Sequence, residues 1–241
     1  MQPMAACGGV EGRVVRAPYT FKPGPYSSHS LLLASLPEAG GGRQVLDVGC
    51  GDGQFAALLA TRGYGVTGIE KPGVIQGPFP GSVELVEADL DEGLPALAGR
   101  YDYILCADVL EHLKSPERLL GELPALMRPH ARLLASLPNA VNIYVRLNVF
   151  LGKFPQHDRG LFDRTHLHFY TWSGWVELLT RAGFHIEKVR PTGIPFGLAL
   201  RRWGDTWPVR FLEGLSYLAA RLWKRMFAYQ FVVTARPAGA A

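Results

Sequence analysis

Short apolar runs that end at glycine-rich or polar turns recur along the chain, and they predict buried β-strands. These runs lie at residues 44–48, 65–70, 101–106, 132–137, 184–190 and 228–235. Residues 83–87 alternate between apolar and polar side chains, which is typical of a strand near a sheet edge. Helical segments of about ten residues separate the strands, so the pattern predicts a doubly wound α/β fold with a mainly parallel sheet.

Local capping signals place the helices. Ser27 or Ser28 can cap a first helix, and the sequence that begins at Ser115 combines an N-cap, a proline and an acidic residue. A helix over 55–61 follows the first strand, and another over 173–182 ends at a glycine. These signals are independent of the strand pattern and agree with it.

The strand at 44–48 runs into a glycine-rich turn at 49–53 and then into a helix. Such a turn lets the backbone approach a nucleotide-like ligand at the carboxyl ends of the strands, although a tight turn that only caps the helix has the same glycines. Asp47 would repel a pyrophosphate but favour a cation, and Glu70 ends the second strand, where a carboxylate can accept both ribose hydroxyls. S-adenosylmethionine carries a sulfonium and an ammonium, so this pair of acids favours it over a dinucleotide.

The sequence VLDVGCGDG at 45–53 resembles motif I of the class I S-adenosylmethionine-dependent methyltransferases, and CADVLEHL at 106–113 resembles the signature found beside the methionine half of their cofactor. The resemblance implies a Rossmann-like sheet of seven strands with helices on both faces, in which the last strand is antiparallel and lies between the fifth and sixth. Glu70 matches the family's ribose-binding acid, and Asp89 its contact to the adenine. The cofactor residues implied in this way are Asp47, Gly49, Cys50, Gly51, Glu70, Lys71, Asp89, Leu90, Ala107 and Asp108. Residues 71–80 depart from the family, because prolines and glycines stand where a helix is usual.

The sequence LFDRTHLHFYT at 161–171 resembles a bacterial subgroup of small-molecule methyltransferases, of the type 11 and type 23 kinds, whose acceptors are quinones, sugars, lipid-linked compounds or natural products. In an extended segment His166, His168 and Tyr170 point to one side, and we predict that this polar stripe contacts the acceptor. Either histidine can remove a proton from an attacking hydroxyl, or both can hold the loop by hydrogen bonds to its backbone. We expect no metal at a set formed by Asp163 and the two histidines.

Three other polar residues are candidates near the site. His112 follows the fourth strand and Asn139 follows the fifth, so both are predicted to line the acceptor pocket, although each also fits a structural role. His29 is interpreted as part of a solvated helix face. A strong base is not essential when the nucleophile is anionic or an amine, because methyl transfer is an in-line displacement that depends mainly on positioning.

The C-terminal third carries the basic charge of the protein. Residues 201–236 hold seven basic side chains against two acidic ones, whereas the whole chain of 241 residues has a net charge of +4. The pattern over 207–227 predicts one basic amphipathic helix, in addition to the elements usual in the family. One interpretation is that it covers the acceptor pocket with its basic face in water; the alternative is contact with an anionic membrane surface.

We therefore expect a single methyltransferase domain over 1–241, with a loose arm at 1–25, a cofactor core at 44–137 and acceptor-side cover elements at 138–172 and 194–227. Three cysteines without metal spacing, and no long apolar run, favour a cytoplasmic protein, attached to the inner membrane surface if the helix binds lipid. The expected reaction is O-methylation of a small molecule. An RNA methyltransferase and a non-catalytic S-adenosylmethionine-binding protein remain alternatives, although nucleic acid is disfavoured because no RNA-binding module is evident.

Overall fold

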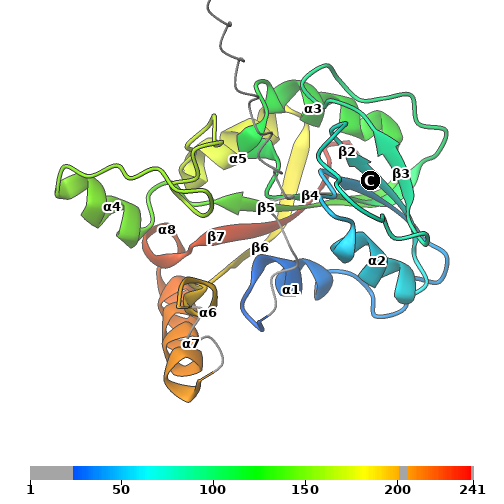
Figure 1. Ribbon diagram of the computed structural model, residues 1–241. Coiled ribbons are helices and arrows are strands. Elements are labelled where there is room, and N and C mark those ends of the chain that lie inside the picture. The colour runs from blue at the N-terminus through cyan, green and yellow to red at the C-terminus, as the bar shows by residue number, and fades with distance from the viewer. Residues whose placement is uncertain (1–23, 201–205, 240–241) are drawn as a thin grey trace, which may run out of the picture.

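The computed structural model describes residues 24–200 and 206–239, so the predicted arm at 1–25 lies almost wholly outside the described residues. Seven strands within these residues form one sheet in the order β3-β2-β1-β4-β5-β7-β6 (Figure 1). The strands are β1 Gln44–Val48, β2 Gly65–Glu70, β3 Glu84–Glu87, β4 Tyr101–Ala107, β5 Met127–Pro138, β6 Phe184–Pro191 and β7 Gln230–Pro237. Strand β7 pairs antiparallel with both β5 and β6, and β3 lies at the edge, which confirms both predictions.

Helices cover both faces of this sheet (Figure 1). The helices are α1 Ser28–Leu33, α2 Gln54–Thr61, α3 Pro116–Glu122, α4 Ile143–Phe150, α5 Trp172–Arg181, α6 Phe196–Ala199, α7 Trp207–Leu222 and α8 Lys224–Phe227, with 3-10 turns at Leu110–His112 and Leu123–Leu126. Apolar residues of α1 and α2 pack on one face, and those of α3 and α5 on the other. None of the helices in the described part of the chain is long and apolar enough to cross a membrane.

Capping explains where several helices begin. The Ser27 hydroxyl accepts a hydrogen bond from the Ser30 N–H at 3.2 Å, as predicted, and Thr171 caps α5 through the Gly174 N–H. Ser115 stands at the N-cap of α3 without a side-chain cap bond, so Pro116 at the first helical position sets that start. Helix α4 was not predicted; its N-cap is Asn142, whose side-chain oxygen accepts from the Tyr144 N–H at 2.9 Å.

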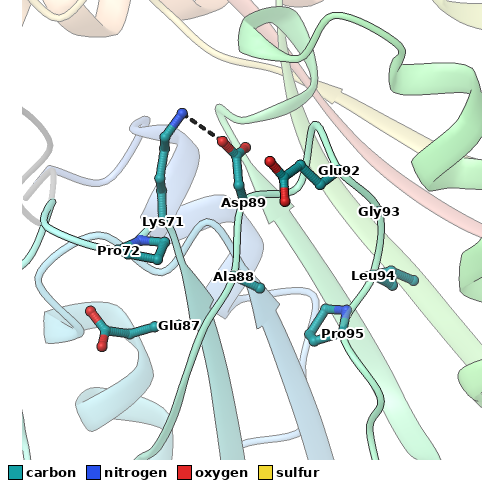
Figure 2. Close-up of a pocket in the computed structure, with 9 residues that line it drawn as sticks. All are labelled: Lys71, Pro72, Glu87, Ala88, Asp89, Glu92, Gly93, Leu94 and Pro95. Atoms are coloured by element: carbon teal, nitrogen blue, oxygen red, sulfur yellow. Dashed lines mark ion pairs between the residues drawn. The ribbon is translucent and has the colours of Figure 1, made fainter.

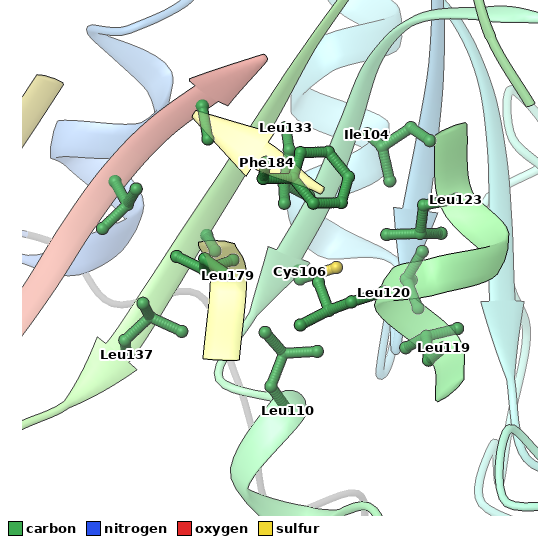
Figure 3. Close-up of a cluster of buried hydrophobic side chains, with 14 of the residues drawn as sticks. Ile104, Cys106, Leu110, Leu119, Leu120, Leu123, Leu133, Leu137, Leu179 and Phe184 are labelled. Carbon is green, nitrogen blue, oxygen red and sulfur yellow. The ribbon is translucent and has the colours of Figure 1, made fainter. Parts of the chain in front are cut away.

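The strands near the centre of the sheet are apolar toward both faces. Leu46 and Val48 belong to the core on the α3–α5 side, whereas Val45 and Leu105 belong to the core on the α1–α2 side. Figure 3 shows the first of these cores, where side chains from β4, β5 and β6 meet those of α3 and α5. Trp175 is fully buried there, and its indole N–H donates to the Pro138 carbonyl at 2.8 Å.

The predicted helix over 207–227 is not continuous. Trp223 has φ −140° and ψ 77°, so the chain leaves helical geometry there and α8 starts anew. A helix that covers the acceptor pocket would turn its apolar side chains toward the protein. In α7 these side chains face outward instead, because Leu215, Leu218 and Leu222 are at least half exposed. Residues 71–80 contain no helix, in agreement with their prolines and glycines.

Candidate active site

The glycine turn after β1 is fixed by backbone hydrogen bonds to β2. The N–H groups of Gly49 and Cys50 both donate to the Ile69 carbonyl, at 2.9 and 3.0 Å. Gly49 has φ +72°, and a Cβ there would lie 2.8 Å from Cγ2 of Val109, so a larger residue fits neither the backbone nor the space. The Cys50 side chain is buried against Gly68, and burial raises the pKa of its thiol.

Glu70 joins the end of β2 to this turn. Its Oε2 accepts a hydrogen bond from the Gly51 N–H at 2.7 Å, and its Oε1 accepts from the Lys71 N–H at 2.9 Å. A carboxylate has about four lone-pair positions, so Glu70 can accept further hydrogen bonds from a ligand. The geometry therefore permits the ribose contact that the sequence predicts.

Asp47 lies at the carboxyl end of β1 and is 2% exposed. Burial, together with the nearby charge of Glu70, raises the pKa of Asp47 to about 7. A narrow hollow of about 40 Å³ opens beside it, lined by His29, Asp47, Gly49, Cys50, Gly51, Asp52, Phe55 and Ala107. A buried carboxylate at the wall of this hollow would gain from a neighbouring positive charge, because the cation would offset its desolvation.

A second and larger hollow, of about 550 Å³, lies where β2 and β3 end. Figure 2 shows that its side chains come from Glu87, the last residue of β3, and from the segments that follow β2 and β3. The Lys71 ammonium lies 2.7 Å from Oδ2 of Asp89, and this contact lowers the pKa of Asp89. Leu90 packs against the sheet core. The predicted adenine-side residues are thus close together, with Asp89 held by an ion pair.

Asp108 follows β4 in a backbone conformation that is unusual for a residue with a side chain. Its φ is +56°, and its Oδ1 accepts hydrogen bonds from the Ser136 hydroxyl and, at 2.6 Å, from the Gln230 amide. Left-handed conformations at non-glycine residues carry strain and persist where surrounding contacts hold them. These contacts fix the chain just beyond Ala107, one of the residues that line the Asp47 hollow.

Two distant segments meet next to this point. The Glu111 carbonyl accepts hydrogen bonds from the N–H groups of Leu167 and His168, at 2.9 and 3.2 Å. Nδ1 of His112 lies 3.2 Å from the Thr165 carbonyl oxygen. His166 Nε2 is 3.9 Å from Oε1 of Glu111, and both side chains are less than 10% exposed.

Glu111, His112 and His166 form one cluster. Each offers one ligand atom, these atoms lie within 4.8 Å of one another, and the rings of His112 and His166 meet edge to face at 4.7 Å. The set can act on a proton or hold a divalent cation. The cluster differs from the metal set of Asp163, His166 and His168 that the sequence suggests. The Asp163 carboxylate accepts hydrogen bonds from Thr165, and His168 Nε2 lies 3.4 Å from the Lys114 carbonyl oxygen.

The other predicted acceptor residues have different surroundings. His168 stacks on Tyr170 with ring centroids 5.4 Å apart, and both are less exposed than Leu167 and Phe169, as the alternation predicts. The prediction for Asn139 is wrong. That residue is fully buried, its amide N–H groups donate to backbone carbonyls of α8 and the residue that follows it, and its oxygen accepts from the Val141 N–H.

Two side chains of the site were missed. Glu111 stands within the sequence CADVLEHL, and the resemblance implies no role for it. A carboxylate next to an apolar run indicates either a helix surface or a buried charge. The sequence predicts a solvated His29. Instead it stacks on Phe55, with centroids 5.1 Å apart, and lines the Asp47 hollow.

Taken together, a doubly wound sheet, a glycine turn and two acids at strand ends define an enzyme of the Rossmann-like methyltransferase class. A family model described as "Methyltransferase domain" matches residues 25–189. A ubiquinone biosynthesis O-methyltransferase from Coxiella burnetii is 30% identical over 164 residues, which cover 62% of this chain and 70% of the relative. A protein of the same name from Escherichia coli O7:K1 is 31% identical over 121 residues, which cover 45% of this chain and 49% of the relative.

Solved structures agree on the fold. A methyltransferase from Mesorhizobium loti is 20% identical, with a TM-score of 0.58 and coverage of 87% of this chain and 98% of that chain. Magnesium protoporphyrin IX methyltransferase from Synechocystis, solved with S-adenosylhomocysteine bound, is 20% identical with a TM-score of 0.54. The match covers 86% of this chain and 78% of that chain. The chain belongs to the methyltransferase-domain family, and it is an S-adenosylmethionine-dependent methyltransferase.

Proposed function

We propose that this enzyme methylates a hydroxyl oxygen of a quinol-type acceptor. The observation that carries the proposal is the position of the Glu111–His112–His166 cluster, directly after the residues that enclose the glycine turn. Val109 contacts the turn at Gly49, and the 3-10 turn that begins at Leu110 carries Glu111 and His112. The relatives named above as ubiquinone biosynthesis O-methyltransferases support the same acceptor class.

The cofactor would lie along the carboxyl ends of β1, β2 and β3. The residues fit S-adenosylmethionine: the buried Asp47 suits its positive charge, Glu70 has lone pairs left for the ribose, and the Asp89 carboxylate can accept from the adenine amine. Gly49 and Gly51 let the backbone approach it, and Cys50, Lys71, Leu90, Ala107 and Asp108 complete the proposed cofactor residues. When bound, the cofactor supplies a methyl group already activated on a sulfonium.

His166 is the proposed proton acceptor. It would take the proton of the acceptor hydroxyl, and the Glu111 carboxylate would stabilise the imidazolium that results. His112 orients the loop through Thr165, and His168 with Tyr170 forms the adjoining wall. We assign residues 44–137 to cofactor binding and 138–172 and 194–227 to the acceptor side of a single domain.

Quinols with isoprenoid tails are lipid-soluble, so the proposal includes peripheral contact with the inner membrane surface through residues 207–227. The rest of the enzyme would lie in the cytoplasm. The C-terminal helices are tied to the acceptor side, because the Asn142 amide donates to the carbonyls of Phe227 and Ala228 at 3.1 and 2.8 Å.

The test is transfer of a labelled methyl group to a panel of catechols and quinols, with matched anilines and bulk RNA as competing acceptors. Label on a catechol oxygen supports the proposal, and label confined to amines or RNA contradicts it. Addition of EDTA determines whether the cluster works with a divalent cation. His185→Gln is the matched control for His166→Gln, because His185 is an exposed histidine of β6, away from the cluster.

A further inference from the structure

Helix α7 turns its small and polar side toward the protein. The Ser216 hydroxyl accepts a hydrogen bond from the Ile194 N–H at 2.9 Å, and a Glu213 carboxylate oxygen accepts from the Gly197 N–H at 2.8 Å. Val209 and Ala220 are buried on the same side. The helix is therefore docked by polar contacts and small residues, and it projects from the sheet (Figure 1).

The opposite side of α7 is apolar and exposed. Its side chains recur at spacings of three and four residues, so they form one stripe along the helix. The stripe consists of Trp207 (79% exposed), Phe211 (65%), Leu215 (52%), Leu218 (52%) and Leu222 (81%). We call these five residues the outer stripe. An apolar stripe that faces outward over the full length of a helix marks an interaction surface.

Basic side chains accompany the outer stripe. Residues 207–227 contain four basic residues and one acidic residue. The acidic one, Glu213, faces the protein, whereas Arg210, Arg221 and Arg225 are exposed. Lys224 is placed differently, with its ammonium 5.0 Å from the Trp172 ring. Positive charge beside exposed tryptophan, phenylalanine and leucine is the composition of helices that lie in the headgroup region of anionic membranes.

We propose that the outer stripe of α7 inserts into the surface of an anionic bilayer, with the axis of the helix parallel to the membrane. Arg210, Arg221 and Arg225 would then lie at the level of the lipid phosphates. The lipid-binding surface itself does not depend on the reaction. Its role in bringing a lipid-soluble acceptor to the site rests on the function proposed above.

Charge favours a bilayer over a second copy of the chain. Two copies that paired through their outer stripes would bring exposed arginines of the same sign together, with no outward-facing acid among residues 206–227 to neutralise them. An anionic membrane supplies both an apolar interior and negative headgroups.

The experiment is co-sedimentation of the full chain with vesicles of phosphatidylcholine alone, or of phosphatidylcholine mixed with phosphatidylglycerol. We expect binding to the anionic vesicles that weakens as salt is added. The double variant Leu215→Ser/Leu218→Ser should bind at least about tenfold more weakly, because two inserting side chains are lost. Leu212→Ser is the matched control, since Leu212 is 41% exposed on the same helix but outside the outer stripe, and it should not alter binding.

Three results would overturn the inference: no sedimentation of the wild type with anionic vesicles at low salt, equal binding by the double variant, or a wild-type dimer that the double variant converts to a monomer in light scattering. Methyl transfer to a water-soluble catechol is measured on the same proteins. Transfer without vesicle binding refutes the membrane surface and leaves the reaction standing. Vesicle binding without methyl transfer to any acceptor refutes the proposed reaction and leaves the membrane surface standing.

Discussion

The Glu70 carboxylate accepts a hydrogen bond from the backbone N–H of Gly51, with Oε2 2.7 Å from the nitrogen. Through this bond a single side chain at the end of β2 fixes the turn that follows β1. The other carboxylate oxygen is bound to the Lys71 N–H, so the orientation of the group is set from both sides. An acid held in this way is preorganised, and little side-chain entropy remains to be lost when a ligand hydroxyl donates a hydrogen bond to it.

The first prediction concerns the removal of that charge. Glu70→Gln keeps the size of the side chain but weakens the bonds to a cofactor ribose, so we expect the Kd for S-adenosylhomocysteine to rise about 10- to 100-fold. Calorimetric titration measures the change, with NAD as the comparison ligand. Glu38→Gln is the control, because Glu38 is exposed in the loop before β1. Equal affinity in wild type and Glu70→Gln would remove Glu70 from the site.

The second prediction follows from the raised pKa of Asp47. Burial and the charge of Glu70 raise this pKa from 3.8 to about 7. Between these values the folded state binds more protons than the unfolded state, so the free energy of unfolding falls as pH rises. The contribution is at most about 4 kcal/mol. We expect Asp47→Asn to lose this decline, as measured by urea unfolding at about pH 4 and about pH 8.

The same titration affects ligand binding. A cation favours the ionised carboxylate, so affinity for S-adenosylmethionine should rise with pH until about pH 7, whereas S-adenosylhomocysteine, which lacks the sulfonium, should show a weaker rise. Asp47→Asn should flatten both profiles. A pH dependence that persists unchanged in Asp47→Asn would assign it to another group.

The third prediction separates backbone strain from lack of space at Gly49. Gly49 and Gly73 have similar φ values, +72° and +79°, but a Cβ at Gly49 would meet Val109 at 2.8 Å, while one at Gly73 would meet nothing within 4 Å. We expect Gly73→Ala to cost about 1 kcal/mol and Gly49→Ala about 1–3 kcal/mol more. Chemical denaturation measures both. Val109→Ala should rescue part of the loss only in Gly49→Ala, and equal costs at the two glycines would contradict the proposed close contact.

The cofactor half of the site could be predicted because its residues follow single strands in sequence. Asp47, Gly49 and Glu70 lie at or next to strand ends, and parallel strands bring their carboxyl ends to one edge. The contact between Glu111 and His166 was different. Its partners are far apart along the chain. The alternation over 166–170 indicates which side chains share a side, but not which distant segment that loop binds through backbone hydrogen bonds.

Periodicity also showed that residues 207–222 are amphipathic but not which side faces the protein. An apolar stripe normally faces the core, whereas here Ser216 and Glu213 bind backbone N–H groups and fix the opposite orientation. Helix α4 was missed for a related reason. Only Val145 of this helix is buried, so its apolar residues show no core-facing pattern.

The last prediction concerns His166 as a proton acceptor. His166→Gln should lower kcat for a catechol about 100-fold while leaving the affinity for S-adenosylhomocysteine unchanged, because the histidine lies beside Glu111 and outside the Asp47 hollow. The defect should shrink with a nitrocatechol, whose hydroxyl is already ionised and needs no base. A structural role would give equal losses with both acceptors, and a metal role would make wild-type activity sensitive to EDTA with both. His185→Gln should match the wild type throughout, since His185 is exposed on β6.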